Sequence, residues 1–172
     1  MLAQLELRPD DDVLEVGFGG GALLEAIGSC TGGRVYGVDI SAAAAARARR
    51  RFGGEASIFE ASVEALPLGP SSVDKACSVN NIYFWADPER AMAELARVLR
   101  PGGRLAIAFE PPEELRKWPG HRYGFRLHEE AEVRALMEAA GFRDIACAEG
   151  RGRRPDRFLC LTGTRGAAEA VP

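Results

Sequence analysis

The chain alternates short apolar runs with stretches in which apolar residues recur at helical spacing. The apolar runs predict strands over the ranges 13–17, 34–39, 57–60, 73–79, 104–109, 142–148 and 157–164. Between them, helices are expected over 22–27, from residue 42 onward, over 88–100 and over 129–140. Strands that alternate with helices are typical of an α/β fold, in which helices cover both faces of a doubly wound, mostly parallel sheet.

The helix after the fourth strand has clear end signals. Asp87 is a good N-cap residue, and Pro88 suits the first helical turn. Pro101 disfavours helical geometry in the residue before it, so this helix is predicted to end at Arg100. The segment 110–128 contains several prolines and glycines, and it is predicted to be an irregular excursion on the surface.

Composition indicates one globular domain over residues 1–172. The 172 residues are 47% hydrophobic and 27% charged, and a chain of this length can bury a sizeable core without a metal. No metal site is predicted. The formal net charge of -3 argues against a protein that coats nucleic acid, so a small-molecule substrate is expected instead.

The cysteines and the hydropathy point to a cytoplasmic location. Four cysteines lie far apart and form no C-x-x-C pair, so they are interpreted as small buried residues in a reducing compartment. No apolar stretch approaches the ~18 residues that cross a bilayer. Residues 1–12 also lack the charged and then apolar profile of a signal peptide.

The most informative segment is V-L-E-V-G-F-G-G-G at 13–21, where an apolar run leads directly into glycines at alternate positions. Glycine lets the backbone adopt positive φ and approach a ligand closely, and amides at the start of the next helix can donate to polar groups. Asp39 ends the second predicted strand about 20 residues further on, where a carboxylate can accept both hydroxyls of a ribose. These features predict a site for an adenosine-containing cofactor.

Two classes of cofactor fit this pattern. Gly17, Gly19 and Ala22 satisfy a loose G-x-G-x-x-A fingerprint, which would indicate a nicotinamide-dependent oxidoreductase. Glu15 lies two residues before the first glycine and completes an E-x-G-x-G-x-G arrangement. With Asp39 downstream, this arrangement resembles the first motif of the Rossmann-like, class I S-adenosylmethionine-dependent methyltransferases.

The resemblance extends along most of the chain. Three further segments are similar to the small-molecule branch of that family, which includes quinone-biosynthesis and sterol-type methyltransferases: V-E-A-L-P at 63–67, A-D-P-E at 86–89 and R-V-L-R-P-G-G-R-L at 97–105. The resemblance implies S-adenosylmethionine as the cofactor. It also implies a seven-stranded sheet whose last strand is antiparallel.

The resemblance assigns roles to residues of the first motif and of the second strand. Gly17, Gly19 and Gly21 are expected to wrap the methionine part of the cofactor. Glu15 is expected to order this loop or to meet the amino group. Asp39 is expected to hold the ribose hydroxyls.

The adenine end departs from the family pattern. Ile40 is expected to lie against the adenine ring. Family members often have an aspartate at the position of Ser62, so the usual carboxylate contact to the adenine amine is missing. Ser62 or the backbone near Val63 is expected to supply a neutral hydrogen bond instead.

Candidates for catalysis follow the fourth predicted strand, at the carboxyl edge where open α/β sheets bind ligands. Methyl transfer is an in-line displacement, so alignment alone can supply ~7 to 11 kcal/mol of the barrier. In the run N-N-I-Y-F-W, Asn80 is a candidate cofactor contact and Tyr83 a candidate catalytic residue. The other apolar members, Ile82, Phe84 and Trp85, are interpreted as packing residues.

The segment 110–128 is predicted to be a lid over the substrate, because long irregular loops at ligand-binding edges often cover them. Within it, His121 and Tyr123 are candidate catalytic residues, and Trp118 lies close by. Residues 1–12 are too few to cover a pocket, as N-terminal helices do in many relatives. The lid, alone or with a second subunit of a homodimer, is therefore expected to close over the acceptor.

These features predict a single-domain methyltransferase that transfers a methyl group from S-adenosylmethionine to a small, fairly apolar acceptor. Two alternatives stay open. One is a nicotinamide-dependent oxidoreductase, which the lack of a second, substrate-presenting domain disfavours. The other is a non-catalytic cofactor-binding partner subunit, which the short N-terminal segment favours. No nucleic acid partner is predicted.

Overall fold

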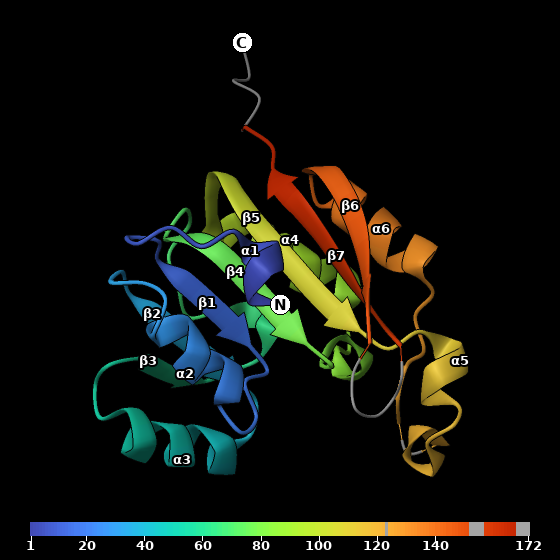
Figure 1. The fold of residues 1–172 in the computed structure, drawn as a ribbon, viewed down its shortest axis with the longest axis horizontal. Coiled ribbons are helices and arrows are strands. Elements are labelled where there is room, and N and C mark those ends of the chain that lie inside the picture. The colour runs from blue at the N-terminus through green and yellow to red at the C-terminus, as the bar shows by residue number, and fades with distance from the viewer. Residues whose placement is uncertain (123, 152–156, 168–172) are drawn as a thin grey trace.

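The computed structural model describes residues 1–122, 124–151 and 157–167, whose strands form one seven-stranded sheet in the order β3-β2-β1-β4-β5-β7-β6 (Figure 1). The strands are β1 (Val13–Val16), β2 (Val35–Asp39), β3 (Ser57–Glu60), β4 (Val73–Val79), β5 (Leu99–Phe109), β6 (Phe142–Gly150) and β7 (Phe158–Arg165). β7 runs antiparallel to β5 and β6, whereas the other hydrogen-bonded pairs are parallel. The predicted α/β sheet with an antiparallel last strand is confirmed.

Helices cover both faces of this sheet. The α-helices are α1 (Leu2–Leu5), α2 (Ala22–Gly28), α3 (Ala42–Phe52), α4 (Pro88–Val98), α5 (Pro112–Leu115) and α6 (Glu130–Ala139). The chain also has three short described 3-10 helices, η1 (Val63–Ala65), η2 (Ile82–Phe84) and η3 (Pro119–Arg122). In Figure 1, α1 and α2 lie in front of the sheet and α4 and α6 lie behind it.

The alternation of side chains along each strand divides the core into two layers. In β1, Val13 packs with residues of α1, α2 and α3, whereas Leu14 and Val16 pack with residues of α4 and α6. In β5, Ala106 and Ile107 are divided between the two layers in the same way. Because both faces of the sheet are buried, its carboxyl edge is the natural place for a ligand.

The strand predicted at 104–109 begins earlier, at Leu99, and α4 ends at Val98 instead of Arg100. Leu99 already has extended backbone geometry, so it leaves the helix before the proline is reached. The chain then turns through Gly102, whose φ of 77° favours glycine, and the register against β4 shifts within this segment.

The segment 110–128 is more ordered than predicted, because it contains α5 and η3. Pro112 occupies the first turn of α5, and Leu115 is buried in the same core layer as α4. Arg157, next to β7, bonds Glu113 of α5 and therefore ties this segment to the sheet.

The expectations from the cysteines are met only in part. Cys77 and Cys160 are buried, but Cys30 and Cys147 are exposed, and all four are free thiols. Cys30 lies in the turn after α2, and Cys147 lies on β6 at the edge of the sheet, so neither position is covered. Among the described helices, none is long and apolar enough to cross a membrane.

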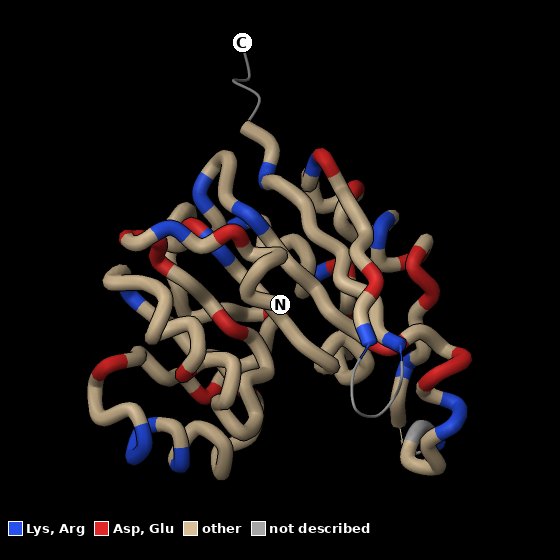
Figure 2. Tube along the Cα trace, viewed as in Figure 1, with Lys and Arg blue, Asp and Glu red and all other residues tan. Residues whose placement is uncertain are grey.

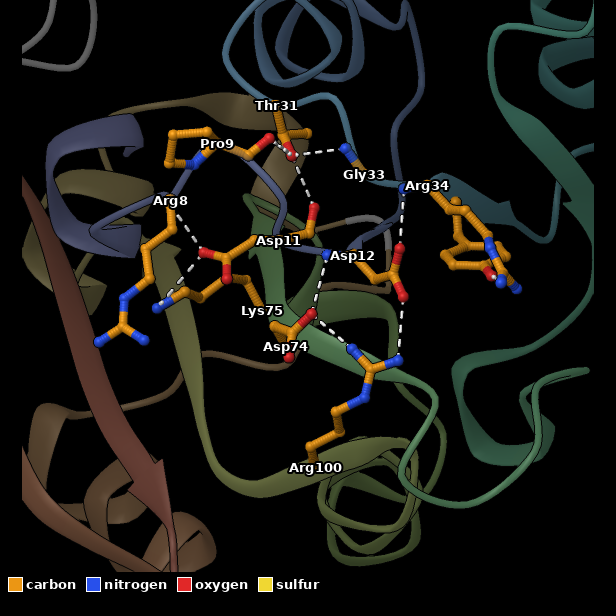
Figure 3. A network of polar contacts seen from close by, with 11 residues as sticks. Arg8, Pro9, Asp11, Asp12, Thr31, Gly33, Arg34, Asp74, Lys75 and Arg100 are labelled. Atoms are coloured by element: carbon orange, nitrogen blue, oxygen red, sulfur yellow. Dashed lines mark hydrogen bonds and ion pairs between the residues drawn. The ribbon is translucent and has the colours of Figure 1, made fainter.

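A network of charges fastens the amino ends of the strands (Figure 3). The Asp12 carboxylate accepts hydrogen bonds from the Arg34 backbone N–H at 2.8 Å and from the Arg100 guanidinium at 2.9 Å. Arg100 also donates to Asp74, which in turn accepts the Asp12 backbone N–H at 2.9 Å. The residues just before β1 and β2 are thereby joined to residues at the amino ends of β4 and β5.

Burial opposes the charge on Asp12, but the Arg34 N–H and the Arg100 guanidinium outweigh it and lower the pKa of Asp12 below its ordinary value of 3.8. A carboxyl group with a lowered pKa contributes stability above its ordinary pKa, and this contribution is lost as pH falls through the folded-state pKa. The network should therefore stabilise the fold at neutral pH.

We predict that Asp12→Ala lowers the free energy of unfolding by about 2 kcal/mol at pH 7, because two bonds to the carboxylate are lost. The difference from wild type should shrink below pH 4, where the wild-type carboxylate also loses its charge. Urea unfolding at several pH values measures both effects. Asp10→Ala, at an exposed neighbouring position, is the control. Equal stability of the two variants would show that the network contributes nothing.

Candidate functional site

The carboxyl ends of the parallel strands bring four segments into a row. Asp39 ends β2, Gly17 follows β1, Asn80 follows β4, and Glu110 follows β5. The sheet order β2-β1-β4-β5 places these residues in that sequence along one edge. This edge is where open α/β sheets bind ligands.

The glycine loop after β1 depends on backbone geometry that favours glycine. Gly17, Gly19 and Gly21 have φ values of 71°, 48° and 75°. At Gly17 there is also no room for a side chain, because an added Cβ would lie 2.2 Å from Cγ of Asn81. The loop is therefore held close to the segment that follows β4.

Asp39 joins the glycine loop to the next loop. Its Oδ2 accepts the Gly19 N–H at 2.8 Å, and its Oδ1 accepts the Ser41 N–H at 2.9 Å. Ser41 itself caps α3, with its hydroxyl oxygen accepting the Ala44 N–H at 3.3 Å. An ionised carboxylate has about four acceptor sites, so Asp39 keeps capacity for two hydroxyl donors such as those of a ribose.

Glu15 is a buried carboxyl group beneath this loop. Glu15 is 4% exposed, and its Oε2 has no hydrogen-bond partner among the described residues. Burial, and secondarily the charge of Asp39, raise the pKa of Glu15 to about 8. A buried carboxyl group with an unused oxygen fits a ligand that carries positive charge, because such a ligand would favour its ionised form.

A pocket opens beside Asp39 at this edge. Its lining includes Gly17, Asp39, Ile40, Ser62, Val63, Asn81, Phe84 and Trp85. Ile40 is 78% exposed, which is unusual for a large apolar side chain and suits contact with a flat apolar ligand group. Ser62 caps η1, and its hydroxyl oxygen accepts the Glu64 N–H at 3.2 Å. The structure thus brings Ile40, Ser62 and Val63 together beside Asp39.

Asn80 does not line this pocket, whereas its neighbour Asn81 does. Asn80 has a φ of 50°, and this left-handed geometry turns the chain at the end of β4. Asn81 then lies against Gly17, and its Oδ1 accepts the indole N–H of Trp85 at 2.8 Å. The repeated asparagine was a signal for this position, but the sequence did not indicate which of the two faces the loop.

Tyr83 is a buried residue whose hydroxyl group is hydrogen-bonded within the fold. It is 2% exposed, and its hydroxyl oxygen accepts the backbone N–H of Glu110. Burial raises the pKa of Tyr83 well above its ordinary value, although the bond from Glu110 acts in the opposite direction. The hydroxyl therefore connects the end of β5 to η2, and it is a poor proton acceptor at neutral pH.

Aromatic side chains gather next to the pocket, and we call the set of Tyr83, Phe84, Trp118 and Phe125 the aromatic cluster. Phe125 is its centre, with ring centroids 4.6 Å from Phe84, 5.2 Å from Trp118 and 5.6 Å from Tyr83. Ile82 and Trp85 are buried, as expected of packing residues, whereas Phe84 packs against Phe125 but is 56% exposed. It lines the pocket and also contacts Phe125.

The lid candidates are placed only in part. Trp118 follows α5 and is 54% exposed. The backbone of His121 lies in η3, and Tyr123 lies outside the described residues. The backbone N–H of Arg126 donates to the Tyr83 carbonyl at 3.0 Å, so the end of the segment 110–128 is attached beside the aromatic cluster.

A mostly parallel sheet with a glycine loop after β1 and a carboxylate with spare acceptor capacity at the end of β2 defines a Rossmann-like, adenosine-binding protein. Residues 14–107, more than half of the chain, match the family described as "Methyltransferase domain". YdaC of Bacillus subtilis, named an uncharacterized methyltransferase, is 31% identical over 166 residues, which are 95% of this chain and 88% of YdaC. The chain belongs to the methyltransferase family.

Solved structures agree with this fold. A Haloferax volcanii protein solved in complex with the Trm112 methyltransferase activator is 23% identical with a TM-score of 0.84, covering 96% of this chain and 87% of that one. A SAM-dependent methyltransferase of Thermotoga maritima is 26% identical with a TM-score of 0.77, covering 95% and 86%. The prediction of a class I enzyme that uses S-adenosylmethionine is confirmed, and the oxidoreductase and non-catalytic alternatives are set aside.

We predict that Glu15→Gln stabilises the protein by an amount that grows between pH 4.5 and 8. A carboxyl group whose pKa is raised to about 8 makes the wild type lose stability as pH rises through that window, and glutamine does not titrate. Chemical unfolding at pH 4.5, 6 and 8 measures the difference. Glu60→Gln, at an exposed position on β3, two strands away from β1, should show no such trend. Parallel pH profiles for Glu15→Gln and wild type would contradict the role of burial.

Proposed function

We propose that this methyltransferase acts on a small, fairly apolar acceptor that lies against the aromatic cluster. The observation that carries the proposal is the position of Phe84, which is exposed between the pocket and Phe125. An exposed aromatic surface of this kind favours apolar or aromatic ligands, since offset and edge contacts between rings are favourable.

The cofactor is expected to lie along the row at the carboxyl edge. Glu15 and the glycines Gly17, Gly19 and Gly21 would hold its amino acid part, and Asp39 its ribose. When bound, it supplies an electrophilic methyl carbon on a positively charged sulfur. The unused Oε2 of Glu15 and the spare acceptor capacity of Asp39 support this arrangement.

The adenine end is assigned to Ile40, Ser62 and Val63. Ile40 offers the exposed apolar surface, and the Ser62 hydroxyl offers a hydrogen bond in place of the aspartate of many relatives. Asn81 is added to this set because it lines the same pocket, and Asn80 is assigned to the acceptor side of the edge.

Catalysis in this proposal rests mainly on alignment, because an in-line displacement needs no acid or base when the acceptor arrives deprotonated. Tyr83 serves as a positioning residue through its bond with Glu110. A direct role of His121 or Tyr123 stays a prediction. The segment 110–128 is proposed as the cover that excludes water from the acceptor.

We also infer a cytoplasmic location, which the four free thiols support. A small-molecule substrate fits the family. A homodimer stays a prediction.

We predict that Asp39→Ala weakens binding of S-adenosylhomocysteine roughly ten- to a hundred-fold, because hydrogen bonds to a charged acceptor contribute about 1.5 to 3 kcal/mol. Isothermal titration calorimetry measures the dissociation constant. Asp39→Asn keeps one carbonyl oxygen for the loop amides and should lie between the two. Circular dichroism verifies that both variants are folded. Unchanged affinity in folded Asp39→Ala would remove this residue from the cofactor site.

We predict that Phe84→Ala lowers kcat/KM at least tenfold for methyl transfer to small phenols and aromatic amines, since the ring that faces the acceptor is lost. Radiolabel carried from S-adenosylmethionine into solvent-extractable product measures the transfer. Phe84→Leu keeps an apolar side chain and should lose less. Affinity for S-adenosylhomocysteine should be nearly unchanged. Equal rates for Phe84→Ala and wild type, or no transfer to any of these compounds, would contradict the apolar acceptor.

A further inference from the structure

Glu110 lies on the carboxyl edge of the sheet, in line with the proposed cofactor-binding segments. It follows β5, and it lies beside Asn80, whose backbone N–H continues the β4 ladder by donating to the Ala108 carbonyl at 2.8 Å. β4 lies next to β1, from which the glycine loop emerges. A ligand held by the glycine loop therefore has Asn80 and Glu110 as the polar side chains that follow along the edge.

The structure fixes Glu110 in place from two sides. Its backbone N–H donates to the buried hydroxyl of Tyr83, and its Oε1 accepts the Asn80 side-chain amide at 3.4 Å. Asn80 makes this contact with left-handed backbone geometry, which is costly for a residue other than glycine. The other carboxylate oxygen, Oε2, has no hydrogen-bond partner among the described residues.

Glu110 has no cationic ion-pair partner among the described residues, unlike the next two glutamates. Glu113 pairs with Arg157, and Glu114 pairs with Lys117 at 2.6 Å. No described arginine, lysine or histidine forms an ion pair with Glu110. Burial, and secondarily the charge of Glu114, raise the pKa of Glu110 above its ordinary value. With Tyr83 as the other titratable group against it, Glu110 is a better proton acceptor than an ordinary surface carboxylate.

We propose that Glu110 receives the O–H or N–H group of the acceptor and accepts its proton during methyl transfer. The acceptor class is thereby narrowed to small apolar molecules in which an oxygen or nitrogen that carries hydrogen is methylated. This proposal rests on the apolar acceptor proposed above. It assigns to the acceptor site a catalytic residue beyond the cofactor-binding set.

The step is balanced in atoms and charge. The acceptor oxygen or nitrogen forms its bond to the methyl carbon as its proton moves to Oε2 of Glu110. The electron pair of the broken methyl–sulfur bond stays on sulfur, which becomes a neutral thioether. Glu110 then releases the proton to water.

Ligand-observed NMR on the protein saturated with S-adenosylhomocysteine tests this proposal with two matched pairs of probes. Phenol and aniline carry the O–H or N–H group, whereas anisole and N,N-dimethylaniline are the same rings without it. Glu110→Gln should weaken phenol and aniline at least tenfold, because a charged acceptor is lost, and should leave the methylated probes unchanged. With S-adenosylmethionine, the rate of transfer to phenol should fall ~10²- to 10⁴-fold.

Glu138→Gln, at an exposed position on α6, is the control, since it removes the same charge away from this edge and should change neither set of probes. If Glu110→Gln affects phenol and anisole alike, or affects neither, the proposal for Glu110 is overturned while the apolar site stands. If none of the four probes binds the wild type, the apolar acceptor fails and the proposal fails with it. The affinity for S-adenosylhomocysteine, measured in the same samples, reports separately on the cofactor site.

Discussion

The loops that follow β1 and β2 converge on the carboxylate of Asp39, and the geometry of the site depends on this junction. Each of its oxygens accepts one backbone amide, from Gly19 on one side and from Ser41 on the other. Hydrogen bonds to a charged acceptor are about twice as strong as neutral ones. They therefore hold the glycine loop against β2 and fix the start of α3. Ile40 lies between Asp39 and Ser41, which this hydrogen bond connects, and its side chain is exposed at the pocket.

The two edges of the sheet serve different purposes. At the amino edge, the carboxylates of Asp12 and Asp74 are matched by Arg100 and by backbone amides, so the charges there are satisfied within the fold. At the carboxyl edge, by contrast, the buried Oε2 of Glu15 has no hydrogen-bond partner among the described residues. Unsatisfied or strained groups persist only where the surrounding structure holds them, and they collect at functional sites. Figure 2 shows that Lys, Arg, Asp and Glu occur in many parts of the chain trace, so this difference lies in how the charges are paired and not in composition.

The sequence predicted most strands and the glycine loop because these features are encoded locally. An apolar run followed by alternating glycines specifies a strand and a tight turn whatever the rest of the chain does. The segment 110–128 was harder, because its two short helical turns depend on long-range contacts. Leu115 is buried only because α5 packs against the core layer of α4, and α5 is further tied by Arg157 from beyond β6. Neither contact leaves a periodic signal in a segment rich in proline.

The cofactor side and the acceptor side of the site differ in predictability for a related reason. Asp39 and the glycines lie at strand ends, so the sheet order alone brings them together. In η2, however, Tyr83 is 2% exposed and the adjacent Phe84 is 56% exposed, and both are aromatic. Hydropathy cannot separate them, because the distinction arises from where the chain turns after Asn80. The residues that we propose for the cofactor can thus be found from the sequence pattern, whereas those that we propose for the acceptor depend on tertiary packing at the same edge.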